Sequence, residues 1–422
     1  MNILGIITEY NPFHYGHLYH LKKAREVSQS DAVICIMNGN FMQRGLPAIL
    51  NKWARAEMAV KNGVDIVIEL PLVYGIRSAE YFAYGAVSLL QSTNITDFLV
   101  FGSEVGQTRP LIEIAEILLK EAPYLKQRLK HYLNLGQPFP KARELSIKDY
   151  LTIKDKQYNI NKNDLLAIIG EPNNILGIEY IKALLKLKSK IKPLTITRKG
   201  SNYHEQILEK GKIASATAIR EQIISNGLES VNQFLPESTK NILDKKNKTI
   251  PPQLDNLGLM ILSRLRKLTA EDLLKFAEID NGIENRITET SRKTGTLAGL
   301  IDKIKTKAFT RTRIQRNLLH ILFNIKKNDF ELLDKYGCQY LRVLAIGKNG
   351  AKILSKLNKK ADIPVIVNPS EQLSDIKPAS KNPLIKSLSY DIMASDIYTL
   401  LSPDTKSRKA RLDFIKPIIK HP

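Results

Sequence analysis

Cysteine is scarce in this sequence, since the 422 residues contain only Cys35 and Cys338 and no CxxC pair. This scarcity argues against a disulfide framework and against a sulfur-rich metal site, so we expect two buried or idle thiols. Long apolar runs are also missing, because no stretch approaches the ~18 uncharged residues of a membrane-spanning helix. The apolar residues 1–7 are too short for a signal peptide and lack a basic segment before them. We therefore expect a cytoplasmic protein with no membrane partner.

Acidic residues are fewer than basic ones, with 42 Asp and Glu against 64 Lys and Arg and a formal net charge of +22. Such a charge attracts polyanions and raises the rate at which they are encountered. Residues 241–422 hold 34 basic and 19 acidic side chains, whereas residues 1–240 hold 30 and 23. The signal for a polyanionic partner therefore lies in the C-terminal half, although a lysine-rich surface kept for solubility would give a similar excess.

Hydrophobic residues at 43% and charged residues at 25% are typical of globular proteins, and the length predicts at least two domains. Short apolar runs rich in β-branched residues predict buried strands, and the segments between them have helical periodicity. Strand and helix alternate, which favours an α/β fold with a parallel sheet covered on both faces. The expected strands are residues 2–8, 31–37, 64–70 and 97–101, and the expected helices are residues 18–27, 52–61 and 78–91.

The rest of the chain is predicted to be mostly helical. Residues 110–160 have the pattern of exposed linking helices, and a strand-like segment follows at 192–200. Beyond about residue 240 amphipathic helices dominate, with a small strand-containing element within residues 342–367. We therefore predict a Rossmann-like α/β domain over residues 1–240 and a mainly helical, basic region over residues 241–422.

Two histidines lie at the expected transition from the first strand to the first helix, in the stretch His14-Tyr15-Gly16-His17. Gly16 allows a phosphate to approach the backbone, and a helix N-terminus attracts anions. Imidazoles spaced i and i+3 face the same side of the turn, so they could hold a nucleotide α-phosphate. Two alternatives remain open: a zinc site that includes His20 and Glu9, and a pair of histidines that only cap and pack the helix.

A second phosphate-binding pattern occurs in the stretch IASATAIR, residues 213–220. Ser215 is a candidate N-cap, Thr217 adds a second hydroxyl, and Arg220 supplies a guanidinium one turn later. Together with the free N–H groups of the helix start, these side chains form a possible triphosphate cradle. An ordinary capped helix with a surface arginine is the alternative.

Jointly the two patterns resemble the HIGH-motif nucleotidyltransferase superfamily. The stretches GIITEYNPFHYGHLYHL, NGNFMQRG, VIELP, FGSE, EPNNILGIEY and IASATAIR, in this order, are similar to the tRNA(Met) cytidine acetate ligase family. The resemblance covers nearly the whole chain, including the basic helical C-terminal region. It implies a Rossmann-like nucleotidyltransferase domain over residues 1–240 and a tRNA-binding role for residues 241–422.

The resemblance implies an ATP-dependent ligase that activates acetate as acetyl-adenylate. The acetyl group would pass to N4 of the wobble cytidine, C34, of elongator tRNA(Met), giving N4-acetylcytidine. ATP would be a substrate, and Mg²⁺ is a possible cofactor. The oligomeric state stays open. Two other functions are weighed against this one: a small-molecule adenylyltransferase of the same superfamily, and a non-catalytic RNA-binding protein.

The resemblance also implies the residues of the site. His14, His17 and Arg220 would be catalytic, no protein ligand for a metal is implied, and the choice between Asn173 and Asn174 as the nucleotide contact stays open. The implied ATP-binding residues are Ile7, Thr8, Glu9, Tyr10, Asn11, Pro12, Phe13, His14, Tyr15, Gly16, His17, Leu18, Tyr19, His20, Gly102, Asn173, Asn174, Arg198, Ser215 and Thr217.

Basic residues cluster in the helical region, where they could contact RNA phosphates. A solvated helix face is the alternative. The candidates are Arg264, Arg266, Arg292, Arg311, Arg313 and Arg316.

The stretch NGNFMQRG follows the second strand, so its polar side chains would line the active site and recognise acetate, ribose or RNA, unless the loop is only structural. Helical spacing makes packing the default role for Trp53, the only tryptophan.

Overall fold

The computed structural model describes residues 1–120, 122–153, 168–198 and 214–421. A central sheet has the strand order β5-β4-β1-β2-β3-β6-β7, and β8 pairs with β6. The first five strands are parallel where they pair with one another. They are β1 (Ile3–Thr8), β2 (Ala32–Asn38), β3 (Ile66–Leu70), β4 (Phe98–Ser103) and β5 (Lys192–Thr197). The four strands predicted from apolar runs are confirmed to within a few residues.

The C-terminal half of the chain adds strands to the same sheet. β6 (Leu341–Ile346) pairs with β3 in the antiparallel sense, and β7 (Val365–Ile366) and β8 (Ile419–Lys420) run parallel to β6. The strand-containing element expected near the end is therefore part of the main sheet. Strands from both sides of residue 240 thus share one sheet. The domain boundary near this residue stays a prediction.

Alternate strand residues point to opposite faces of the sheet, so each face has its own apolar core. One face is covered by α1 (Tyr15–Ser28), α2 (Lys52–Lys61), α10 (Ala216–Asn226) and α11 (Glu237–Lys245). The other is covered by α3 (Leu72–Gly75), α4 (Ala79–Ser92), α5 (Thr108–Lys120) and α9 (Pro172–Lys186). This is the α/β arrangement expected from the sequence, and it places the loops after the parallel strands at one edge.

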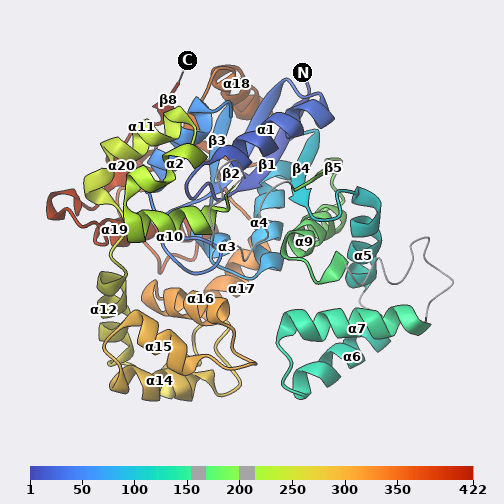
Figure 1. Cartoon of the computed structure of the whole chain (residues 1–422), viewed down its shortest axis with the longest axis vertical. Helices are drawn as coiled ribbons and strands as arrows, with labels where there is room; N and C mark the ends of the chain where they lie inside the picture. The colour runs from blue at the N-terminus through green and yellow to red at the C-terminus, as the bar shows by residue number, and fades with distance from the viewer. Residues whose placement is uncertain (121, 154–167, 199–213, 422) are drawn as a thin grey trace.

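Two helical groups extend from this core. The first is a hairpin of α6 (Pro123–Asn134) and α7 (Phe139–Ile153). The second comprises α12 (Leu254–Leu265), α13 (Ala270–Leu273), α14 (Ile283–Lys293), α15 (Leu297–Ile304), α16 (Arg311–Leu322) and α17 (Lys327–Tyr336). Figure 1 shows both groups at the end of the molecule opposite the two termini.

The last helices return the chain to the sheet. They are α18 (Gly350–Lys360), α19 (Pro383–Thr399) and α20 (Leu412–Ile415). The apolar core of α12 to α17 is continuous with the core on the α4 face of the sheet. Among the described helices, none is long and apolar enough to cross a membrane.

Candidate active site

The loop after β1 positions both histidines of the HYGH stretch. His14 is the N-cap of α1, and its Nδ1 accepts a hydrogen bond from the backbone N–H of Gly16 at 3.0 Å. The N–H of His14 in turn donates to Nδ1 of His17 at 3.3 Å, which completes a capping box. The two ring centroids are 3.8 Å apart. Because both Nδ1 atoms accept, each neutral ring carries its proton on Nε2, which is then a donor.

All three histidines near this turn are held neutral. Burial lowers the pKa of His14 to about 3, and the charges of Arg198 and Arg220 act in the same direction. Burial lowers the pKa of His20 to about 4, again with a contribution from Arg198. The pKa of His17 is lowered well below its usual value by burial, then by its histidine neighbours and both arginines. At neutral pH the positive charge of the site therefore resides on guanidinium groups.

The IASATAIR segment reaches this turn from a distant part of the sequence. Ser215 caps α10, with its Oγ accepting from the N–H of Ala218 at 3.2 Å. Arg220 donates to the carbonyl oxygen of Asn11 at 2.8 Å and to Oγ1 of Thr217 at 3.1 Å. The structure thus brings Arg220 against the loop that carries the two histidines, and both phosphate-binding patterns converge on one place.

Strands β4 and β5 supply a third wall. A side chain at Gly102 would put its Cβ 3.0 Å from Cγ of Arg198 and 3.8 Å from Cδ2 of His20. Glycine at this position therefore leaves the room that Arg198 needs. Arg198 also donates to Oδ1 of Asn173 at 2.8 Å, which ties the start of α9 to the site.

The two asparagines at the start of α9 have different environments. Asn174 is 1% exposed, and its Oδ1 accepts from the N–H groups of Glu104 and Val105 while its Nδ2 donates to the carbonyl of Ile168. Its amide is therefore committed to holding the loop after β4. Asn173 is half-buried, and its amide accepts from Arg198 and donates to Oε1 of Glu104 at 2.5 Å. The choice between the two asparagines as a nucleotide contact stays a prediction.

The NGNFMQRG loop is tightly built into the fold. Asn38 donates to Oε1 of Glu9 at 3.3 Å, Asn40 accepts from the N–H of Lys52 at 2.7 Å, and Gln43 donates to the carbonyl of Arg77 at 2.9 Å. These hydrogen bonds support the alternative of a structural loop, and a role of the loop in recognising acetate, ribose or RNA stays a prediction.

Arg55 is a positioning residue that the sequence did not reveal. Its guanidinium is fully buried and donates to the carbonyl oxygens of Glu9 at 2.6 Å, Asn38 at 3.0 Å and Leu50 at 3.0 Å, and also to that of Gly39. Burial lowers the pKa of Arg55 to about 10, so the group stays charged at neutral pH. It links the loops after β1 and β2, and its place within an ordinary amphipathic helix gave no signal of this.

The zinc alternative finds no support, because the described part of the chain contains no group of three or more His, Cys, Asp and Glu side chains placed to hold a metal ion.

Comparisons with known proteins agree with this geometry. Residues 1–413 match the family model HIGH Nucleotidyl Transferase. The chain is 53% identical to the tRNA(Met) cytidine acetate ligase of Halothermothrix orenii, covering 100% of both proteins, and 44% identical to that of a Thermoanaerobacter species, again covering 100% of both. The chain belongs to the tRNA(Met) cytidine acetate ligase family.

Solved structures of the family have the same fold. A crystal structure of Thermotoga maritima TmcAL bound with alpha-thio ATP matches with a TM-score of 0.91 at 35% sequence identity. The apo form of that protein matches with a TM-score of 0.93, and each comparison covers 100% of both chains. The fold expected for this family is therefore confirmed.

The arginines proposed to meet tRNA differ in their surroundings. Arg266 donates to the carbonyls of Ser291 and Thr294, and Arg313 donates to Oδ1 of Asp280 at 2.6 Å. The remaining contacts are Arg264 with Oδ1 of Asn324 at 2.7 Å, Arg311 with Asp302 at 2.5 Å, and Arg316 with Glu278 at 3.7 Å.

Arg292, on α14, is exposed and makes no ion pair or hydrogen bond within the described ranges. The contact of these six arginines with tRNA therefore stays a prediction.

Proposed function

We propose that this protein uses ATP to activate acetate as acetyl-adenylate and then acetylates N4 of the wobble cytidine, C34, of elongator tRNA(Met). The observation that carries the proposal is the convergence of His14, His17 and Arg220 on the start of α1. The names of the full-length relatives support the choice of substrate. The alpha-thio ATP bound in the T. maritima protein supports ATP. A tRNA substrate accords with a cytoplasmic location.

In the first step an acetate oxygen attacks the α-phosphorus of ATP, and the bond to pyrophosphate breaks. Nε2 of His14 and of His17 would donate to phosphate oxygens, because Nδ1 of each ring is already occupied. Arg220, and Arg198 from the β5 side, would balance the negative charge that develops on the phosphates. The protein therefore acts by positioning and by electrostatics, without a covalent nucleophile.

In the second step N4 of cytosine attacks the carbonyl carbon of acetyl-adenylate. The C–N bond forms, the C–O bond to AMP breaks, and the proton lost from N4 passes to solvent or to the leaving phosphate. The base must leave its stack to reach the anhydride, which an anticodon loop permits. The net charge of +22 favours the encounter with RNA.

Magnesium would enter this reaction with the nucleotide. The described residues provide no cluster of carboxylates and histidines for a metal ion of their own. A magnesium ion would therefore be held mainly by the triphosphate, where it would neutralise charge on the leaving pyrophosphate.

The test is acetate-dependent exchange between pyrophosphate and ATP, followed by transfer of labelled acetate to tRNA(Met). Both reactions are expected, and only the second should need RNA. A small-molecule adenylyltransferase would instead transfer AMP to a phosphorylated metabolite without RNA. A non-catalytic RNA-binding protein would bind tRNA with no exchange and no transfer, and either of those results would overturn the proposal.

A further inference from the structure

Residues 40–48, which follow β2, form a closed loop beside the nucleotide site. The N–H of Ala48 donates to the carbonyl oxygen of Asn40 at 2.9 Å, so the two ends of the loop meet. Nearer the tip, the N–H of Met42 donates to the carbonyl oxygen of Leu46 at 2.8 Å. Loops of this kind are compact units, so the contacts at the two ends set the position of the whole loop.

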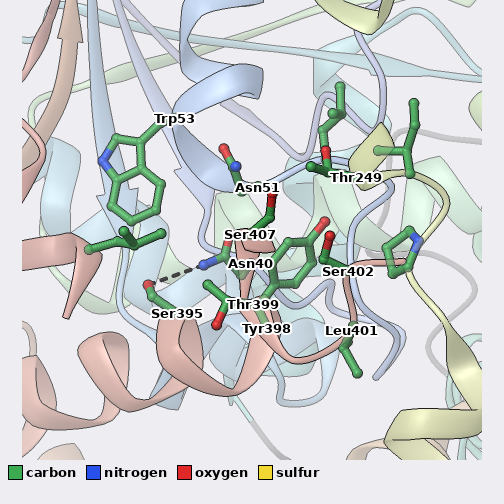
Figure 2. Close-up of a pocket in the computed structure, with 14 residues that line it drawn as sticks. Asn40, Asn51, Trp53, Thr249, Ser395, Tyr398, Thr399, Leu401, Ser402 and Ser407 are labelled. Carbon is green, nitrogen blue, oxygen red and sulfur yellow. Dashed lines mark hydrogen bonds between the residues drawn. The ribbon is translucent and has the colours of Figure 1, made fainter. Parts of the chain in front are cut away.

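One turn of α19 contacts both ends of this loop. Nδ2 of Asn40 donates to Oγ of Ser395 at 3.1 Å, and the hydroxyl of Tyr398 donates to the carbonyl oxygen of Ala48 at 2.8 Å. Figure 2 shows Ser395 and Tyr398 beside Asn40, with a dashed line for the first of these bonds. Ser395 and Tyr398 lie on the same side of the helix, because they are separated by one turn. A helix 350 residues further along the chain therefore holds this loop in place.

The hydrogen bond from Tyr398 continues into the site through a single peptide group. The carbonyl of Ala48 and the N–H of Ile49 belong to the same peptide plane, and this N–H donates to Oδ1 of Asn11 at 2.8 Å. The carbonyl oxygen of Asn11 accepts from Arg220 at 2.8 Å. Three hydrogen bonds of 2.8 Å therefore connect Tyr398 with the guanidinium of Arg220.

These hydrogen bonds are shielded from water. Asn11 is 4% exposed, Tyr398 is 9% exposed and Ala48 is fully buried. Hydrogen bonds in such surroundings are stronger than in water, and bonds joined through one peptide group polarise one another. Burial raises the pKa of Tyr398, although the charge of Arg55 acts against it, so the hydroxyl stays protonated and remains a donor at neutral pH.

The place of Asn11 matters because its carbonyl oxygen holds the guanidinium of Arg220. Asn11 lies in the same turn as His14, three residues before it. A shift of Asn11 would therefore move the guanidinium relative to the imidazoles of His14 and His17. Charges that stabilise a developing phosphate charge must be in place before the reaction, and small displacements are costly.

We propose that Tyr398 is a positioning residue for the formation of acetyl-adenylate. Its hydroxyl holds the peptide group between Ala48 and Ile49, which holds Asn11 and, through Asn11, the guanidinium of Arg220. This inference rests on the proposed function and adds to it a residue from the C-terminal half of the chain. Tyr398 acts through other groups and contacts neither ATP nor acetate in this role.

Tyr398→Phe removes the hydroxyl and keeps the ring, whose centroid lies 6.2 Å from that of Phe41. We expect kcat for acetate-dependent pyrophosphate exchange to fall about 3- to 10-fold, the usual effect of one lost hydrogen bond. KM for ATP should change less than about twofold, because Arg220 acts on charge that develops during the reaction.

Tyr390→Phe is the matched control. Tyr390 is also buried on α19, but its hydroxyl donates to Oδ2 of Asp329 on α17 at 3.1 Å. Each variant loses one hydrogen bond of a buried tyrosine, so the midpoints of urea unfolding should be similar. Only Tyr398→Phe should lower kcat. An equal fall of kcat in both variants would show a merely structural role and would overturn the proposal, as would an unchanged kcat in Tyr398→Phe.

A double-mutant cycle identifies the group through which Tyr398 acts. In the Arg220→Ala background, Tyr398→Phe should cause no further fall of kcat, because the guanidinium that it positions is gone. The same fold-loss in both backgrounds would mean that Tyr398 does not act through Arg220, and the proposal would be wrong.

The unchanged protein separates this inference from the proposed function. Absence of acetate-dependent exchange in the unchanged protein would reject the ligase mechanism, and the positioning role with it. Exchange in the unchanged protein that is equally fast in Tyr398→Phe would reject the positioning role alone.

Discussion

The arginines of the nucleotide site and those of the helical region differ in the groups that surround their guanidinium groups. Arg220 and Arg198 contact the site loops, and their charges reach the buried histidines. Arg313 and Arg286 also donate to backbone carbonyls, but these belong to Glu278, Lys303 and Ile304 within the helical region. The two groups of arginines therefore differ in what surrounds them, which their spacing in the sequence does not reveal.

The largest effect is expected from Arg220→Ala. Loss of this guanidinium should lower the rate of acetate-dependent pyrophosphate exchange about 10²- to 10³-fold, because it removes charge from the developing phosphate. The measurement is steady-state exchange with saturating ATP. Arg286→Ala is the control, since Arg286 only ties α14 to the carbonyls of Lys303 and Ile304. Similar losses in both variants would erase the contrast between the two regions.

The histidines allow a pH test of the same contrast. Their lowered pKa values mean that the unfolded chain binds protons below pH 6.5 while the folded site does not, down to about pH 3 for His14 and about pH 4 for His20. Stability is therefore complete above pH 6.5 and falls as the pH is lowered through this window, by about 1 kcal/mol per histidine per pH unit.

Replacing His14 and His20 by glutamine should flatten this part of the stability curve, measured by urea unfolding between pH 7 and pH 5. An unchanged slope would mean that these histidines are not held neutral. The arginines of the helical region cannot contribute in this range, because they stay protonated.

A smaller effect is expected from Arg313→Ala. Its hydrogen bonds to the carbonyl of Glu278 and to Asp280 are lost, so the free energy of unfolding should fall by about 1–2 kcal/mol. The check is denaturant unfolding together with the KM for tRNA. A raised KM at unchanged stability would show instead that Arg313 contacts RNA.

The smallest effect is expected from Arg292→Ala. This exposed guanidinium has no partner in the described part of the chain, so its removal should leave stability unchanged. If it contacts one phosphate, KM for tRNA should rise about two- to threefold, and the slope of log K against log salt should fall by about one. No change in either quantity would remove Arg292 from the proposed RNA surface.

Local patterns predicted the strands and their order along the chain well. Apolar runs gave the parallel strands, and the two phosphate-binding patterns gave the residues that converge at α1. The first helix begins at Tyr15, three residues before the start that its apolar periodicity predicts, because His14 caps it. The alternative in which the histidines cap the helix had allowed for this.

Contacts between residues far apart in the chain could not be predicted from local sequence patterns. Nothing local indicates that β6 joins β3, that Arg55 gathers carbonyls from two loops, or that Asn174 is committed to the backbone while Asn173 faces Arg198. The hydrogen bonds of Arg266 and Arg313 to backbone carbonyls could not be predicted either. A basic helix face has the same spacing whether its arginines contact RNA or carbonyl groups.

The pairing of β3 with β6 also bears on how the chain can be made and divided. During synthesis the edge of β3 has no partner until residues 341–346 leave the ribosome, and any fragment that ends before them keeps an apolar strand edge open to aggregation. The sheet that carries the nucleotide site is thus completed only when the far end of the same polypeptide has joined it.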